Sequence, residues 1–574
     1  MESEASNNSL LILLLLLDSF PVGHVLRGLA SLPSTPEPNG GNIEVYKRMC
    51  VGLKVALGLQ RMRKSTFLTF ASAVAAANVS LPVIPTSPPS TASQILDRRL
   101  ASFSIEFSYL PSFGGNKTHP NELTRNLMNR LVERTGLGPD VRPGGITVDS
   151  SVFDPNAPAL NLSLSPSQGV WRTTYGPAYF ESYLVFPKTS RFILDVNLGN
   201  DSITIAQNQI EAGIKYLGWD RIFSIQLGNE PDHYSRPGWS SAAFTAKFLN
   251  WTSALTQSLN LPARIFQANG FAEDPTSSAP MTTVSTINEG IDKTGAIKLF
   301  DHHTYQYSTC DPARNAKATL EALVNHNNIT AYLDLWKPQI AAARGVGKEF
   351  VIGEYSSISC SGKQNVSDTY GQAMWLADTI LYAASLNVSR LHMHQGATLV
   401  LQSSQQANSP GFSWYDLWYP VPSERYGSAR ASPSYVAYLL VTEAVGKSGR
   451  SRLALIRDSS LPSTLAVYAI WDPSSRTNGI ARMVILNMSL RRQDVAADEA
   501  LTVTVDVGKY LRGGRATAKV KRMSSPGVES KDSDRVTWAG QSYSAGVPVG
   551  DEIVEQLDAG KVNIRGSEGV LITF

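Results

Sequence analysis

The sequence is poor in cysteine, in charged blocks and in long hydrophobic runs, and each shortage excludes a class of protein. Its 574 residues contain three cysteines, Cys50, Cys310 and Cys360, whose spacing does not match a zinc site. Lys and Arg form no dense block and the net charge is only +3, which argues against nucleic acid or an anionic membrane as a partner. The apolar run at residues 10–17 is too short to span a bilayer. What remains is an ordinary globular composition with room for a large domain and a smaller one.

Several features near the N-terminus and along the chain indicate export. Met62 is followed by Arg63, Lys64, an apolar stretch and small residues at 75–77, which is the pattern of a signal peptide. We predict a doubtful extension at 1–61, a signal peptide at 62–77 and a mature, secreted chain. Nine N-x-S/T sequons of the predicted mature chain fit a glycoprotein: Asn78, Asn116, Asn161, Asn200, Asn250, Asn328, Asn365, Asn387 and Asn487.

The middle of the chain alternates between short β-like runs and helical patterns. Residues 78–95 are rich in Pro, Ser and Thr and are expected to form a linker or a strand that joins a later sheet. The β-like runs are 101–108, 140–145, 191–199, 223–230, 264–270, 297–305, 349–357 and 390–396. Helical patterns cover 120–135, 203–217, 241–258, 316–343 and 368–386, whereas 146–190 is weakly helical and is expected to hold an active-site loop. Eight such units predict an α/β fold, a (β/α)8 TIM barrel over 96–437.

The last part of the chain has strands without helices between them. β-like runs occur at 465–472, 481–488, 501–507, 515–522 and 568–574. This pattern predicts a C-terminal antiparallel β-sandwich over 438–574.

Two glutamates follow apolar strands of the predicted barrel. Glu230 ends the fourth run and Glu354 ends the seventh, and barrel active sites lie at the carboxyl ends of the strands. These two strands are nearly opposite each other, so the two carboxylates should meet across the mouth of the barrel. A facing pair of carboxylates predicts a glycosidase, in which one protonates the leaving oxygen and the other attacks or activates water.

Four segments carry a resemblance to a known family. IQLGNEPD, HHTYQY, GEYSSISCSGKQNVSD and TEAVG resemble glycoside hydrolase family 79, over roughly residues 80–574. That family contains β-glucuronidases and heparanase-like endoglucuronidases. The resemblance implies a retaining mechanism without a cofactor, with Glu230 as acid/base and Glu354 as nucleophile.

The same resemblance implies substrate-binding roles for other residues. Asn229 matches the residue that binds the sugar 2-hydroxyl. Tyr305, or with less support Tyr307, matches the tyrosine that holds the nucleophile. The loop at 359–362, which includes Gly362, matches the region that meets the uronate carboxylate, where backbone N–H groups and tyrosine hydroxyls can bind an anion.

The second predicted strand departs from the family pattern. Relatives usually read Arg-x-Gly-Gly-Asn-Thr-x-Asp, whereas this chain has Ile146 in place of the Asn. One polar substrate contact is therefore lost, and the fine specificity should differ. Asp149 is retained and is expected to bind a sugar hydroxyl.

The histidines and cysteines near the strand ends have ordinary explanations. We predict no metal site at His302, His303, His392 and His394, because alternate strand residues face opposite sides of a sheet.

Cys310 and Cys360 follow neighbouring strands, so a disulfide between them is expected in an oxidising compartment; two free thiols are the alternative.

The leading functional hypothesis is an exo-acting β-glucuronidase that removes terminal glucuronic acid, or its 4-O-methyl ether, from an oligosaccharide or polysaccharide. An endo-glucuronidase of the heparanase type should carry clustered basic residues in the barrel loops, and none is found there. A neutral-sugar hydrolase and a carbohydrate-binding pseudoenzyme are competing hypotheses. A pseudoenzyme would be expected to lack a catalytic Glu, and both are present.

Overall fold

The computed structural model describes residues 77–164, 171–398, 411–475, 479–493, 501–511, 518–557 and 560–574. The predicted extension and the predicted signal peptide, except Ala77, lie outside these residues. Within the described ranges, no helix is both long and apolar enough to cross a membrane.

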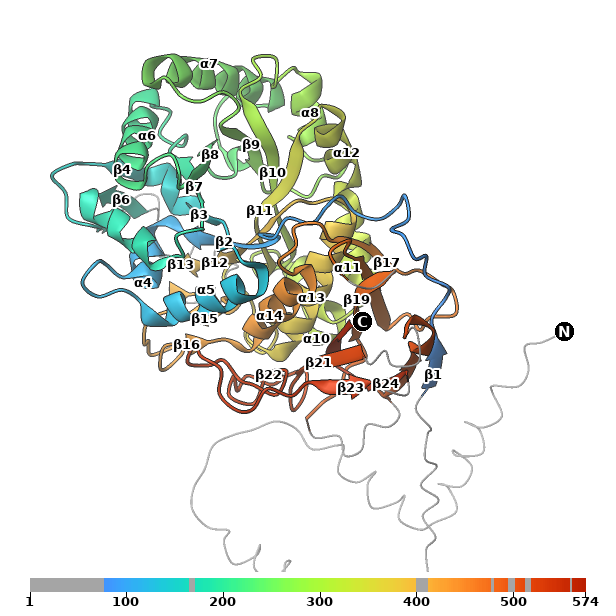
Figure 1. Cartoon of the computed structure of the whole chain (residues 1–574). Coiled ribbons are helices and arrows are strands. Elements are labelled where there is room, and N and C mark those ends of the chain that lie inside the picture. Colours follow the sequence, from blue (N-terminus) through green and yellow to red (C-terminus); the bar gives the residue numbers. More distant parts are fainter. Residues whose placement is uncertain are drawn as a thin grey trace, which may run out of the picture. The chain divides into compact units, whose positions relative to one another are not determined.

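Eight parallel strands close into a barrel (Figure 1). Each of the eight β-like runs predicted for the barrel overlaps one of them, and β12 pairs with β2 to close the ring. The strands are β2 (Ala101–Glu106), β3 (Val141–Gly144), β7 (Phe192–Val196), β8 (Ile222–Leu227), β9 (Phe266–Phe271), β10 (Ile297–Ser308), β11 (Glu349–Ser359) and β12 (Leu391–Gln395). The predicted barrel is thereby confirmed.

The strands are buried on both faces, but the two faces differ in polarity. In β8, Ile225 and Leu227 belong to the hydrophobic core, whereas Gln226 accepts a hydrogen bond from Arg142 of β3. The barrel interior thus contains a polar network, and this network leads to the site described below.

Helices surround the barrel, and their ends follow ordinary capping rules. In α5 (Glu122–Thr135) the Asn121 side chain accepts a hydrogen bond from the Thr124 N–H, and Gly136 ends the helix in the left-handed conformation. Other helices before β12 include α4 (Leu110–Gly114), α6 (Ile203–Leu217), α7 (Ser241–Leu259), α8 (Thr283–Asn288) and α13 (Tyr370–Ser385). The predicted helical patterns other than 316–343 agree with α5, α6, α7 and α13 within two residues.

The pattern at 316–343 is divided into several short helices rather than one. They are α9 (Pro312–Lys317), α10 (Leu320–Leu323), α11 (His326–Leu333) and α12 (Lys337–Gly345). Thr319 and Asn325 each cap a new helix with their side chains, and a proline stands in the first turn of α12. Capping residues inside a helical pattern start new helices, because their side chains replace the missing backbone acceptors.

The segment after β3 differs from its prediction. Its described part contains 3-10 helices η2 (Ile146–Ser150) and η3 (Pro177–Val185) and a small sheet of β4 (Ser151–Phe153), β6 (Trp171–Tyr175) and β5 (Asn161–Leu164). Aromatic rings of this segment, such as Tyr175, Tyr179 and Phe180, pack on one another. The described residues of this segment therefore form a packed substructure, and only Ile146 among them lines the cavity described below.

Besides two two-stranded sheets, the described part of the chain has two sheets built mainly from strands that follow the barrel. A larger, antiparallel sheet contains β17 (Arg452–Leu455), β18 (Leu465–Trp471), β19 (Ile480–Asn487), β25 (Glu568–Thr573), β21 (Ala518–Ser524) and β22 (Thr537–Trp538), with β23 (Glu555–Leu557) paired to β21. A smaller sheet contains β1 (Ala77–Ser80), β20 (Val503–Asp506) and β24 (Lys561–Ile564). The predicted antiparallel sheet domain is confirmed, and residues 77–80 form a strand of it that runs parallel to β20.

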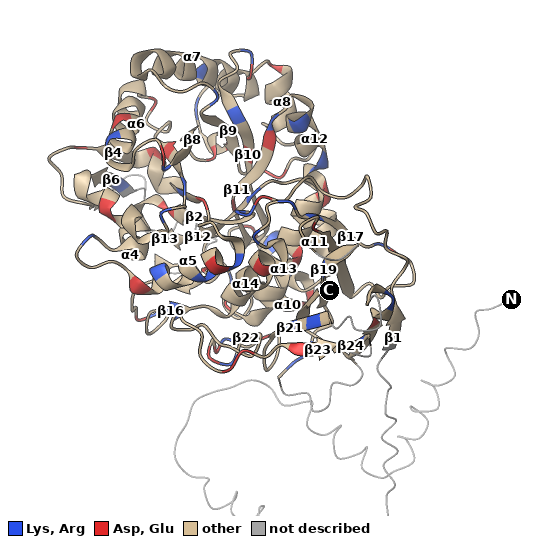
Figure 2. Cartoon of the chain, viewed as in Figure 1, with Lys and Arg blue, Asp and Glu red and all other residues tan. Residues whose placement is uncertain are grey.

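Both faces of the larger sheet are covered. In β18, Val467 and Ala469 pack in a core with the smaller sheet, whereas Tyr468 and Ile470 belong to the barrel core. Helix α13 is buried from Tyr370 to Ala384, as expected for a helix enclosed on all sides. The predicted domain boundary at 437/438 falls inside α14 (Val436–Val445), which is also buried. Figure 2 shows basic and acidic residues interspersed over both the barrel and the C-terminal strands.

Candidate active site

A cavity of about 270 Å³ lies at the carboxyl ends of the barrel strands. Its ionisable lining includes Glu106, His233, Glu230, Glu273, Arg314, Glu354 and His394. The predicted residues Asn229 and Tyr305 also line it. Residues predicted from the carboxyl ends of different barrel strands therefore line the same cavity.

Glu230 and Glu354 face each other across this cavity. Glu230 follows β8, where its backbone adopts a left-handed conformation with φ 50°, and Glu354 lies in β11. A carboxylate oxygen of each, together with a ring nitrogen of His303, lies within 4.8 Å of the others. The Glu230 side chain is 20% exposed and that of Glu354 only 6%, so Glu230 is the more accessible of the two.

Glu354 is held as an anion. Burial raises its pKa, but neighbouring positive charge and hydrogen bonding outweigh burial, so the pKa falls to about 2. The groups responsible are His394, His303, Arg142 and Tyr305.

Arg142 connects Glu354 to the rest of the polar interior. This fully buried guanidinium donates to Glu354 Oε2 at 2.8 Å and to Asp195 at 2.6 Å. It also donates to the Asn229 side-chain oxygen at 2.9 Å and to Gln226 at 2.9 Å. Arg142 thus fixes the position of Glu354, the predicted nucleophile, and of Asn229, the residue predicted to bind the sugar 2-hydroxyl.

Of the two candidate tyrosines, Tyr305 contacts Glu354. Its hydroxyl donates to Glu354 Oε1 at 2.7 Å. The hydroxyl of Tyr307 instead donates to the carbonyl oxygen of Ala322 at 3.1 Å, and Tyr307 is absent from the cavity lining.

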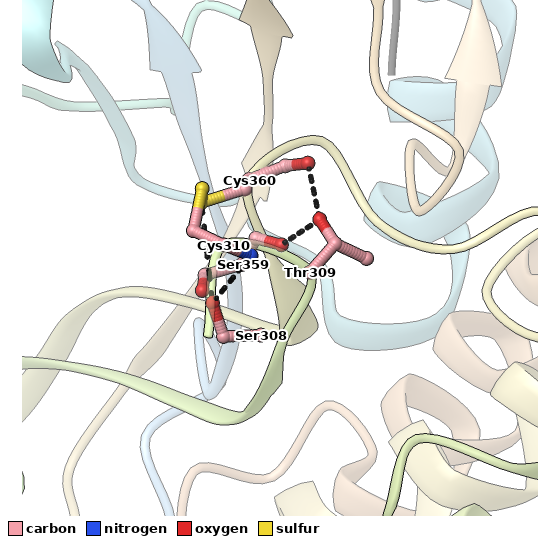
Figure 3. The surroundings of a disulfide bond; sticks show 5 residues. All are labelled: Ser308, Thr309, Cys310, Ser359 and Cys360. Carbon is pink, nitrogen blue, oxygen red and sulfur yellow. Dashed lines mark hydrogen bonds between the residues drawn. A yellow bond between two sulfur atoms is a disulfide. The ribbon is translucent and has the colours of Figure 1, made fainter. Parts of the chain in front are cut away.

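The wall of the cavity beyond β11 is fastened by a disulfide between Cys310 and Cys360 (Figure 3), with Cα atoms 6.0 Å apart. The Thr309 hydroxyl donates to the carbonyl oxygens of Ser359 at 3.2 Å and Cys360 at 3.0 Å. Ser359, Cys360 and Ser361 line the cavity. Both strands that flank the wall are thus tied together beside the site.

The backbone of this wall has an uncommon conformation. Cys360, Ser361 and Gly362 have φ values of 59°, 68° and 77°, a region that costs free energy for residues other than glycine. A Cβ atom on Gly362 would lie 3.1 Å from the Trp414 side chain and from the Tyr415 nitrogen. Gly362 therefore lies behind the cavity lining, where a side chain would be crowded.

The comparisons with known proteins agree with these features. The family model described as the glycosyl hydrolase family 79 C-terminal beta domain matches residues 467–571. A β-glucuronidase of Aspergillus niger is 26% identical over 527 residues, covering 85% of this chain and 91% of that protein. A β-glucuronidase of Neurospora crassa is 27% identical over 493 residues, covering 77% and 84%. The chain is a homologue of these β-glucuronidases, and its C-terminal part matches glycoside hydrolase family 79. The resemblance inferred from the sequence motifs is thus confirmed, and the protein is a glycoside hydrolase.

A solved structure supports the fold of this glycoside hydrolase. A 4-O-α-L-rhamnosyl-β-D-glucuronidase from Fusarium oxysporum superposes with a TM-score of 0.70 at 21% identity, covering 86% of this chain and all of that one. That protein shares the barrel and the C-terminal sheets.

Asp149 lies outside the cavity lining of the hydrolase. Its carboxylate accepts hydrogen bonds from the backbone N–H groups of Leu198, Gly199 and Asn229 and from the Tyr234 hydroxyl. Four protein donors leave this carboxylate little capacity for a sugar hydroxyl, so it positions the turn that carries Asn229 and Glu230.

The four strand histidines separate into two pairs. His303 and His394 face the site, whereas His302 bonds to Thr283 and His392 donates to the Ile352 carbonyl oxygen. Burial lowers the pKa of both His302 and His392 to about 3. In the described part of the chain, one group of three residues, Glu230, His303 and Glu354, has ligand atoms close enough for a metal ion. Both Glu354 oxygens already accept hydrogen bonds, one of them from a guanidinium, and the absence of a metal stays a prediction.

Several lining residues were not identified from the sequence. Tyr415 and Ser413 come from the segment after β14 (Gly411–Phe412), which contributes no barrel strand, so no strand-end argument could find them. Glu106 ends β2, and inspection of that strand end alone could have identified it.

Proposed function

We propose that this protein is a secreted, retaining, exo-acting β-glucuronidase that removes terminal glucuronic acid or its 4-O-methyl ether from glycans. The observation that carries the mechanism is the approach of the Glu230 and Glu354 carboxylates within 4.8 Å. Retaining glycosidases have carboxyl groups about 5–5.5 Å apart, whereas inverting ones need about 6.5–9.5 Å to admit a water.

The chemistry follows from the two environments. The Glu354 anion attacks the anomeric carbon while Glu230 gives its proton to the leaving oxygen, which breaks the glycosidic bond and forms a glycosyl ester on Glu354. Glu230, now ionised, takes a proton from water as that water attacks the anomeric carbon, and Glu354 leaves as a carboxylate. Arg142 and Tyr305 hold the two Glu354 oxygens in place, and Asn229, fixed by Arg142, binds the sugar 2-hydroxyl.

A uronate is the proposed glycone. The two curated relatives are β-glucuronidases, and the wall at 359–361 lines the cavity where the resemblance expects the uronate carboxylate. Burial raises the pKa of Tyr415 well above its ordinary value, so its hydroxyl stays protonated and can donate to the same anion.

Exo action is supported by the size of the cavity and by the distribution of charge. About 270 Å³ is below the roughly 300–1,000 Å³ of most ligand pockets, which suits one sugar unit better than a polymer segment. Four glutamates and one arginine line the cavity, whereas an endo-acting enzyme on a sulfated polymer would favour a basic cleft.

The test is hydrolysis of p-nitrophenyl β-glycosides by the wild type and by Glu354→Gln, with detection of the first-formed anomer by NMR. We expect cleavage of the glucuronide with retained β configuration, and its loss in the variant. Cleavage of the glucoside or galactoside instead would refute the uronate assignment. An α-configured first product would refute retention.

A matched pair of glycine variants distinguishes the roles of the two carboxylates. Glu354→Gly with added azide should form an α-glucuronosyl azide, because azide replaces the nucleophile, whereas Glu230→Gly should form the β-azide. The opposite assignment of products would exchange the proposed roles of the two residues.

A further inference from the structure

The cavity contains one branched aliphatic side chain among its described lining residues, Ile146. It is 43% exposed, while its neighbours on that wall are polar. A lone exposed aliphatic residue on a surface needs no explanation, but one at the rim of a polar sugar site affects which substituents the site accepts.

A series of contacts connects Glu354, through His394 and Glu106, to the backbone next to Ile146, and Glu230 takes no part in it. His394 Nδ1 lies 3.5 Å from Glu354 Oε2, and His394 Nε2 lies 3.7 Å from Glu106 Oε2. The Glu106 Oε1 atom accepts the Thr147 backbone N–H at 3.0 Å. Ile146 directly precedes Thr147 and lines the cavity together with Glu106, so it lies on the Glu106 side of the site. On the opposite side, Glu230 contacts His303 and His233.

The orientation of the sugar follows from this order. The anomeric carbon C1 must lie between Glu230 and Glu354, and the leaving group must lie on the Glu230 side. In a pyranose ring C4 is opposite C1, so the 4-position extends across His394 and Glu106 towards Ile146.

We infer that Ile146 selects a glucuronate whose 4-oxygen carries an apolar substituent, such as a methyl ether, over one with a free 4-hydroxyl; this inference rests on the proposed function. A free hydroxyl beside Ile146 loses hydration without gaining a donor or acceptor from that side chain. A methyl group there leaves water and packs on the isoleucine, which favours binding of the ether.

The test compares kcat/KM for p-nitrophenyl β-glucuronide and for its 4-O-methyl ether. The wild type should prefer the ether by roughly fourfold, the effect of burying one methyl group. Ile146→Asn should abolish or invert this ratio, whereas Ile146→Leu should retain it. Leu184, 59% exposed on η3 and outside the cavity lining, supplies the control Leu184→Asn, which should leave the ratio as in the wild type.

The outcomes are distinguishable. Equal ratios in the wild type and Ile146→Asn, or a wild type that prefers the free hydroxyl, would overturn the role of Ile146 while leaving β-glucuronidase activity intact. Failure of the wild type to cleave either glucuronide would overturn both proposals, and the fault would then lie with the assigned substrate class.

Discussion

A buried carboxylate remains an anion only when the charges and donors around it outweigh its lost hydration. For Glu354 one of these donors is the Tyr305 hydroxyl at 2.7 Å. Tyr305→Phe should therefore raise the pKa of Glu354, move the acidic limb of the kcat/KM profile to higher pH and lower the maximum about 10- to 100-fold. Tyr307→Phe is the control, because its hydroxyl bonds to the Ala322 carbonyl oxygen. Equal effects of the two variants would contradict this role for Tyr305.

The same carboxylate should affect stability at acid pH. The pKa of Glu354 is about 2 in the fold against an ordinary 4.5, so its ionised form stabilises the protein above pH 4.5, and this contribution is lost as the pH falls towards 2. The difference in Tm between the wild type and Glu354→Gln should therefore change in favour of the variant between about pH 5 and pH 3. Glu122→Gln, at a surface residue of α5, should follow the wild type. A pH-independent difference for Glu354→Gln would contradict the depressed pKa.

Residues at strand ends could be predicted because the barrel brings all those ends together. Glu230, Glu354 and Asn229 follow from this rule, and the structure places them around one cavity. The network role of Arg142 could not be predicted, since it depends on side-chain directions inside the barrel. The same limit applies to Asp149, whose four hydrogen-bond donors come from three separate segments.

At the scale of elements, the shape of the wall at 359–361 depends on the Cys310–Cys360 disulfide and on hydrogen bonds from Thr309. Replacing both cysteines, Cys310→Ser with Cys360→Ser, should raise KM for the glucuronide more than it lowers kcat, because we propose that the wall binds the substrate and takes no part in the chemistry. Loss of the disulfide should also lower the free energy of unfolding by about 2–4 kcal/mol, measurable by urea denaturation. Thr309→Val keeps the disulfide but removes two hydrogen bonds to this wall, and should raise KM less. An unchanged KM in the double variant would show that the wall holds its shape without the bond.

Strands could be predicted more accurately than helices and loops. An apolar run of strand length in a βα alternation has few competing conformations, so each of the eight barrel strands overlaps a predicted run. The division of 316–343 into short helices depends on whether Thr319 and Asn325 cap a helix or lie within one, which local spacing does not decide. The sheet of β4, β5 and β6 packs through aromatic contacts that no periodicity reveals.

At the scale of the molecule, the fold determines which sequons can carry a glycan in the native protein. Asn487 is fully buried in β19, and its amide donates to the carbonyl oxygens of Leu501 and Ile564. A glycan there would remove these bonds and separate the sheets, so folded, exported protein should be unmodified at Asn487. Exposed sites such as Asn116 and Asn250 should be occupied to a measurable extent. Peptide mass spectrometry after enzymatic deglycosylation in 18O-water tests this, and occupancy at Asn487 would contradict the packing of β19.

The barrel and the C-terminal sheets should unfold together, because α13 is buried between them. Asp378 of α13 accepts hydrogen bonds from His326 Nδ1 at 2.8 Å and from the Tyr468 hydroxyl of β18 at 2.5 Å. Asp378→Ala leaves His326 buried without this partner and leaves the Tyr468 hydroxyl only a 3.3 Å bond to the residue-378 carbonyl oxygen, which should cost about 3 kcal/mol. Tyr468→Phe removes one of the two bonds and should cost less. Calorimetry should show one transition that moves to lower temperature in both variants, since packing around α13 couples the two parts. Two transitions, of which only one moves, would show that the sheets fold independently of the barrel.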